Sequence, residues 1–150
     1  MPRHRQRQHL PYNREDLCAM VGDVRRYPEF LPWCLGARVY NARPDRFDAD
    51  LIIGFKMFRE KFTSRVYTQC PDRIYVDYIR GPMKYLYNDW RFIAQDDGST
   101  VIDFEVDFQF KSRLLEKAIG DVFTKATNRM VDAFRTRADA LFADQQKAAD

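Results

Sequence analysis

Residue types that catalyse reactions are sparse in this sequence. Its two histidines, His4 and His9, both lie in a basic segment at the start of the chain, so a Ser–His or Cys–His pair would depend on that segment. No Cys-x-x-Cys or His-x-x-x-His spacing indicates zinc, and no Gly-x-Gly-x-x-Gly or Walker-type loop indicates a nucleotide. We therefore expect no catalytic residue, no metal, no cofactor and no enzymatic activity.

The carboxylates that come nearest to an acid–base pair are Asp103, Glu105 and Asp107. They alternate with phenylalanine and valine along one strand-like run, so the same alternation that groups them also places them opposite the apolar face. A solvated sheet face is the preferred interpretation, and a catalytic pair is the alternative.

Two other polar residues follow the apolar alternation instead of opposing it. Glu60 has the same parity as Phe62, and Asn88 has that of Trp90. A polar group that points inward needs a partner, because burial without one costs a few kcal/mol. We expect Glu60 and Asn88 to be polar points in an apolar pocket, unless a β-bulge or a strand end turns them outward.

The elements that would position these residues are mostly strands. From Arg38 to Phe110 the apolar residues recur with period two, most clearly from Ile102 to Phe110, and turn signals such as Gly81-Pro82 separate the runs. Short connections favour an antiparallel meander with one apolar face.

One long helix is expected to cover that face. From Ser112 to Phe142 apolar residues recur at steps of three and four, and Ser112 is a suitable N-cap. A shorter helix, Arg14 to Val21, is expected after Asn13. The predicted fold is α+β, a helix-grip in which a curved antiparallel sheet wraps around one C-terminal helix, with short helices near the N-terminus.

Composition bounds the class of protein. The 150 residues fit a single domain, 1–150, in which 1–9 form a basic arm or edge strand, and the net charge of +3 does not single out a nucleic acid or a membrane. No apolar run reaches the roughly 20 residues of a spanning helix. Cys18, Cys34 and Cys70 are odd in number and widely spaced, so we expect reduced thiols and a cytoplasmic protein.

Several stretches together resemble a known family, and the resemblance extends from about Leu10 to Leu141. They are the run from Tyr27 to Cys34, which reads Tyr-Pro-Glu-Phe-Leu-Pro-Trp-Cys, and then Phe62 to Val66, Trp90-Arg91-Phe92, Asp107 to Ser112 and Ala133 to Ala138. The chain is similar here to the coenzyme Q-binding protein Coq10 and RatA family of the START-like, polyketide-cyclase-related superfamily.

This resemblance implies a helix-grip fold whose cavity binds ubiquinone or a similar polyisoprenoid lipid, with a carrier or chaperone role in respiratory electron transport. The alternative it implies is a RatA-type module that binds the large ribosomal subunit and blocks subunit association. Transient contact with the inner membrane is compatible with the first role, and no DNA partner is expected. The residues expected to line or gate the cavity are Phe30, Trp33, Leu51, Ile53, Phe62, Val76, Trp90, Phe104, Ile119, Val122, Phe123 and Met130.

Overall fold

The computed structural model describes residues 3–55 and 57–149, and the side chains of all of these except residues 55, 58, 119 and 144–149. Its elements follow one another as β1 (Arg3–Leu10), α1 (Arg14–Gly22), the 3-10 helix η1 (Val24–Glu29), β2 (Cys34–Arg43), β3 (Arg46–Phe55), β4 (Phe58–Gln69), β5 (Arg73–Arg80), β6 (Met83–Ala94), β7 (Thr100–Phe110), α2 (Arg113–Asn128) and α3 (Met130–Ala149).

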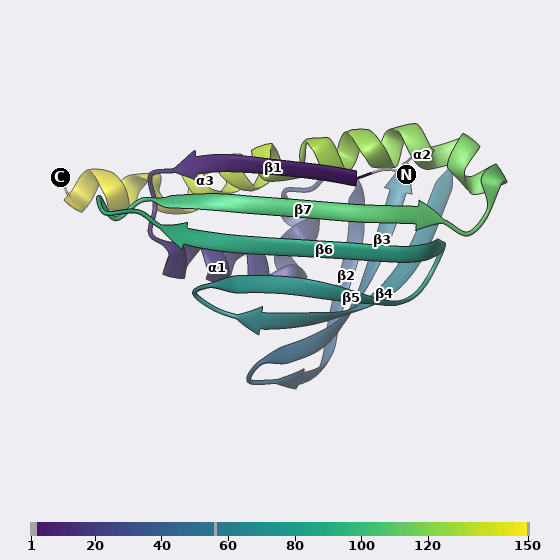
Figure 1. Cartoon of the computed structure of the whole chain (residues 1–150), viewed down its shortest axis with the longest axis horizontal. Helices are drawn as coiled ribbons and strands as arrows, with labels where there is room; N and C mark the ends of the chain where they lie inside the picture. The colour runs from purple at the N-terminus through teal and green to yellow at the C-terminus, as the bar shows by residue number, and fades with distance from the viewer. Residues whose placement is uncertain (1–2, 56, 150) are drawn as a thin grey trace.

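The strands form one antiparallel sheet of seven strands in the order β1-β7-β6-β5-β4-β3-β2. Strands β2 to β7 form the predicted meander, and the N-terminal strand β1 joins it beside β7, with Arg3 opposite Asp107 and Leu10 opposite Thr100. The basic segment is therefore an edge strand. Figure 1 shows α2 and α3 lying end to end along the sheet. The α+β helix-grip architecture is confirmed.

The prediction of one continuous C-terminal helix was wrong in one respect. Arg129 separates α2 from α3, although its carbonyl still accepts a bond from the Ala133 amide across the break. Within the described residues, α2 contacts β7, whereas α3 contacts β1 and α1. The two segments thus cover different parts of the sheet, and the apolar period alone does not show such a break.

Both predicted helix caps are present. The Asn13 side chain accepts a bond from the Asp16 amide at 2.8 Å, and the Ser112 hydroxyl accepts from the amides of Leu114 and Leu115. Helix α1 buries Leu17 and Val21 against the sheet. These caps start the helices at the residues that the sequence indicated.

The expectation of three reduced thiols was wrong. Cys18 of α1 and Cys70, just after β4, form a disulfide with Cα atoms 5.8 Å apart, and Cys34 is a free, buried thiol. The two cysteines lie 52 positions apart in the sequence and meet only because α1 packs on the sheet near β5 and β6. Counting cysteines could not reveal that proximity.

Candidate functional site

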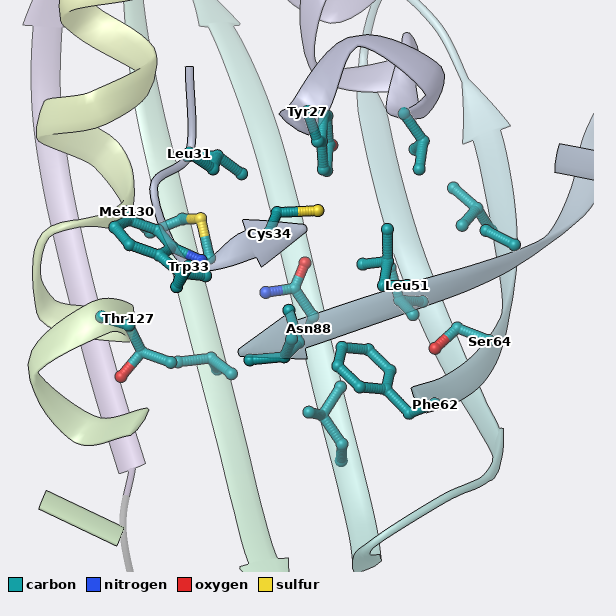
Figure 2. A pocket seen from close by; sticks show the side chains of 18 of the residues that line it. Tyr27, Leu31, Trp33, Cys34, Leu51, Phe62, Ser64, Asn88, Thr127 and Met130 are labelled. Carbon is teal, nitrogen blue, oxygen red and sulfur yellow. The ribbon is translucent and has the colours of Figure 1, made fainter. Parts of the chain in front are cut away.

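A cavity of about 120 Å³ lies between the inner face of the sheet and helices α2 and α3. Strands β3 to β7 form one wall of the cavity, and the segment from η1 to the start of β2 forms another. Figure 2 shows side chains from these elements projecting into the space. For scale, an apolar cavity of about 150 Å³ engineered into another protein stays dry and binds benzene. The present cavity is somewhat smaller than that, so it has room for about one ring.

Most of the residues expected to line a cavity do so. Their strand positions share the inward parity, so alternation brings them to one face. They are Trp33, Leu51, Ile53, Phe62, Val76, Trp90, Phe104, Phe123 and Met130.

Of the other three expected residues, the structure places two elsewhere and does not describe the side chain of the third. Val122 lines a smaller neighbouring hollow of about 30 Å³, which also touches Trp33 and Phe123. The Phe30 ring lies outside the cavity lining, because it packs edge-on against Phe134 with ring centroids 5.0 Å apart. The side chain of Ile119, in α2, lies outside the described part of the chain.

The polar residues of the lining are few. Asn88 lies in the cavity wall, as its parity predicted, whereas Glu60 lies in the neighbouring hollow. The sequence reasoning missed Ser64 and Thr127, which also line the cavity. Ser64 was detectable, because it stands on β4 midway between the inward residues Phe62 and Val66.

Two further polar groups in the wall are neutral and partnered. Burial raises the pKa of the Cys34 thiol to about 11, so the thiol is protonated at neutral pH and a poor nucleophile. The Tyr27 hydroxyl donates to the Val21 carbonyl, and burial raises its pKa as well. The described lining of the cavity holds no Asp, Glu, Lys, Arg or His side chain.

The helix break borders the cavity. Thr127 precedes Arg129 and Met130 follows it, and both line the cavity on the helix side (Figure 2). The Thr127 hydroxyl donates to the Thr124 carbonyl at 2.9 Å, so its hydrogen is already used. The break between α2 and α3 therefore lies beside the cavity, with lining residues on both sides of it.

The outer face of the sheet carries the acidic residues, as their parity predicted, but Asp103 is not solvated. It is only 7% exposed, because Arg5 binds it through two nitrogens and Arg7 through one, at 3.0–3.3 Å. The hydrogen bonds from Arg5 hold the pKa of Asp103 below its usual value against the opposing effect of burial. The prediction that Asp103 lies on the outer face was therefore right, and the prediction that it is solvated was wrong.

Asp89 on β6 repeats this arrangement. Arg73 binds both of its oxygens at 2.8 and 3.0 Å, and Arg91 approaches one of them at 3.4 Å. Burial alone would raise the pKa of Asp89, but the bonds from Arg73 and Tyr87 outweigh it and the pKa is lowered. We call these two groups, Arg5–Asp103–Arg7 and Arg73–Asp89–Arg91, the arginine clamps.

Neither histidine is part of the cavity lining. His9 on β1 contacts the Ser99 hydroxyl at 2.5 Å, and the His4 ring lies 6.2 Å from that of Phe104. Among the described residues, no three His, Cys, Asp or Glu side chains are grouped so that they could hold a metal ion. In the same part of the chain, no helix is long and apolar enough to cross a membrane.

The sheet, the covering helices and the apolar cavity define a START-like helix-grip protein. A family model for polyketide cyclase / dehydrase and lipid transport matches residues 10–135, and the chain belongs to this family. Solved structures agree: the aromatase/cyclase Zhui from Streptomyces superposes with a TM-score of 0.78 over 92% of this chain and 93% of its own, at 12% identity, which shows the fold alone. The 18 kDa protein CC1736 from Caulobacter crescentus is 37% identical, with a TM-score of 0.74 over 95% of this chain and 99% of its own.

Two of the named relatives carry names that point to different roles. The ribosome association toxin RatA of Rickettsia prowazekii is 40% identical over 133 residues, which cover 86% of this chain and 90% of that protein. The mitochondrial coenzyme Q-binding protein COQ10 of Drosophila melanogaster is 32% identical over 127 residues, which cover 82% of this chain and 52% of that protein. The resemblance to the Coq10 and RatA family is confirmed, and both names describe association or binding rather than a reaction.

Proposed function

We propose that this protein binds an isoprenoid lipid, ubiquinone or a close analogue, in the cavity between sheet and helices and acts as its carrier. The observation that carries this proposal is the uncharged, almost wholly apolar lining of the cavity. Burial of apolar surface contributes about 25 cal/mol per Å², so such a site gains affinity without many polar contacts. The name of the COQ10 relative supports the choice of ligand.

The size of the cavity suggests how such a lipid would lie. A volume of about 120 Å³ has room for about one ring and is too small to hold a polyisoprenoid chain beside it. The head of the lipid would occupy the cavity, and its chain would leave the cavity past the neighbouring hollow beside Val122 and Phe123.

Mass spectrometry of lipid extracted from the natively purified protein tests the proposal, together with titration of the emptied protein with ubiquinone. A variant, Ala126→Phe, fills space where Ala126 lines both the cavity and the hollow. Asn128→Phe adds the same side chain at an exposed position of α2 and is the control. We expect Ala126→Phe to lose ubiquinone and Asn128→Phe to retain it. Equal retention by both would contradict the proposal.

The second candidate is binding to the large ribosomal subunit, which the names of the RatA relatives suggest. The arginine clamps favour it, because each places two guanidinium groups on one carboxylate and so leaves a surplus positive charge on the outer face of the sheet. Guanidinium groups bind phosphate well.

Co-sedimentation with large subunits at increasing salt tests this role. Binding through phosphates should weaken steeply with salt, and Arg5→Ala with Arg91→Ala should weaken it further and reduce the salt dependence. Lys117→Ala, an exposed change on α2, is the control. Unchanged sedimentation of the double variant would show that the outer face does not bind the large subunit.

A further inference from the structure

The Ser64 hydroxyl has no hydrogen-bond partner among the described residues, although Ser64 is only 4% exposed. It stands in the wall of the cavity (Figure 2). A buried hydroxyl without a partner is costly, and such groups are rare in folded proteins. The hydroxyl of Ser64 therefore has a free donor and free acceptor capacity inside an apolar space.

Asn88 faces the same cavity from β6, and Figure 2 shows its amide directed into it. Within the described residues, no hydrogen bond of its side chain is present, in contrast to Thr127 and Tyr27, whose hydroxyls donate to backbone carbonyls. Strand β5 lies between the strands of Ser64 and Asn88. The two free polar groups therefore lie at separate positions on the wall that the sheet forms.

The charges around the cavity restrict what these groups would bind. With no cationic side chain in the described lining, a carboxylate or phosphate would enter without compensation, and burial of an unpaired charge is strongly unfavourable. Glu60 in the neighbouring hollow would repel an anion further. Among lipid head groups, a neutral one therefore fits this cavity better than an anionic one.

We infer that Ser64 and Asn88 are the polar anchors of the site and select a neutral head group that carries hydrogen-bond-accepting oxygens, such as a quinone, over both hydrocarbons and fatty acids. This inference rests on the proposed lipid-binding function. The serine hydroxyl and the asparagine NH₂ would each donate to a carbonyl or ether oxygen of the head. The apolar walls would supply most of the affinity, and the two anchors would supply the preference.

Isothermal titration with three probes whose alkyl chains have nine or ten carbons tests the inference: a decyl-substituted ubiquinone, decylbenzene and decanoate. We expect the quinone to bind about 10-fold or more tightly than decylbenzene, and decanoate to bind more weakly still. Ser64→Ala and Asn88→Leu should each lower quinone affinity several-fold and leave decylbenzene affinity unchanged or higher. Val76→Ala, an apolar change in the same wall, should weaken the quinone and decylbenzene alike.

Thermal unfolding adds a second readout that does not depend on ligand. Ser64→Ala removes a buried group without a partner, so the melting temperature of the ligand-free protein should rise while quinone affinity falls. Loss of both stability and affinity would mean that Ser64 is merely structural, and the inference would be overturned.

The outcomes separate the inference from the function on which it rests. If the quinone and decylbenzene bind equally and both variants leave their ratio unchanged, the anchors are refuted while the apolar carrier stands. If decanoate binds as tightly as the quinone, the selection for neutral heads is wrong. If no probe binds, the proposed function fails and the anchors fail with it.

Discussion

The two faces of the sheet are built from the same alternating strands but use their polar groups in opposite ways. On the outer face, Asp103 and Asp89 are buried under arginines that satisfy their oxygens. On the inner face, Ser64 and Asn88 stand in an apolar cavity with hydrogen-bonding capacity to spare. Polar groups that bind one another stabilise a fold, whereas polar groups left free beside a cavity are available to a ligand.

The packing of α3 against the inner face should be more sensitive to truncation than the outer face is. Phe134 is 1% exposed, and its ring packs against Trp90 and Tyr27 with centroids 4.9 and 5.3 Å away. We expect Phe134→Ala to lower the free energy of unfolding by about 3–5 kcal/mol, through lost burial and an enlarged cavity. Urea denaturation measures it. A loss below about 1 kcal/mol would mean that the helix α3 does not close the core here.

The disulfide tests whether the helix α1 depends on its covalent link as well as on packing against the sheet. Opening the Cys18–Cys70 bond, whose two cysteines lie 52 positions apart in the sequence, should cost about 2–4 kcal/mol of unfolding free energy, chiefly by loosening the unfolded chain. Unfolding with and without a reductant measures the cost. Cys70→Ser should show the same loss and no longer respond to the reductant; a continued response would contradict the assignment.

Among the outer-face groups, Asp89 should matter most. Asp89→Ala leaves Arg73 without its two charge-assisted bonds, and we expect a loss of about 1–3 kcal/mol in a denaturant titration. Asp77→Ala, at an exposed position of the neighbouring strand, should change stability by less than about 0.5 kcal/mol. Equal effects would show that the clamp is no different from an ordinary surface charge.

Acid should weaken the outer face, and this is the smallest effect expected for any one residue. The pKa of Asp103 is lowered from 3.8 by Arg5, and that of Asp48 is lowered by Arg65 and Asn41. Carboxylates with a lowered folded-state pKa stabilise the fold above the unfolded value, so that stability is lost as the pH falls below about 4.

Unfolding free energy measured between pH 7 and pH 2 checks this titration. Asp103→Asn should lack the contribution of the Asp103 carboxylate at neutral pH, about 1 kcal/mol or less of unfolding free energy. The variant should therefore lose less stability on acidification than the parent protein does. A parallel decline in both would show that Asp103 does not contribute to the acid sensitivity.

Local patterns in the sequence predicted a large part of this structure. Period-two alternation placed Phe62, Trp90 and Phe104 on the inner face and Asp103 on the outer face, because side chains alternate across any strand. The N-caps at Asn13 and Ser112 were equally readable, since capping depends on the nearest few residues. Neither the fold class nor the cavity-facing parity of Asn88 needed long-range information.

Only the tertiary structure decided which residues far apart in the chain are in contact. The Cys18–Cys70 bond depends on how α1 packs on the sheet, and the cover that Arg5 gives to Asp103 depends on β1 joining as an edge strand. The packing of Phe30 on Phe134 rather than on the cavity is of the same kind. Alternation tells which side of a strand a residue faces. It does not tell how much of the space on that side the neighbouring elements fill, and that unfilled space is the site.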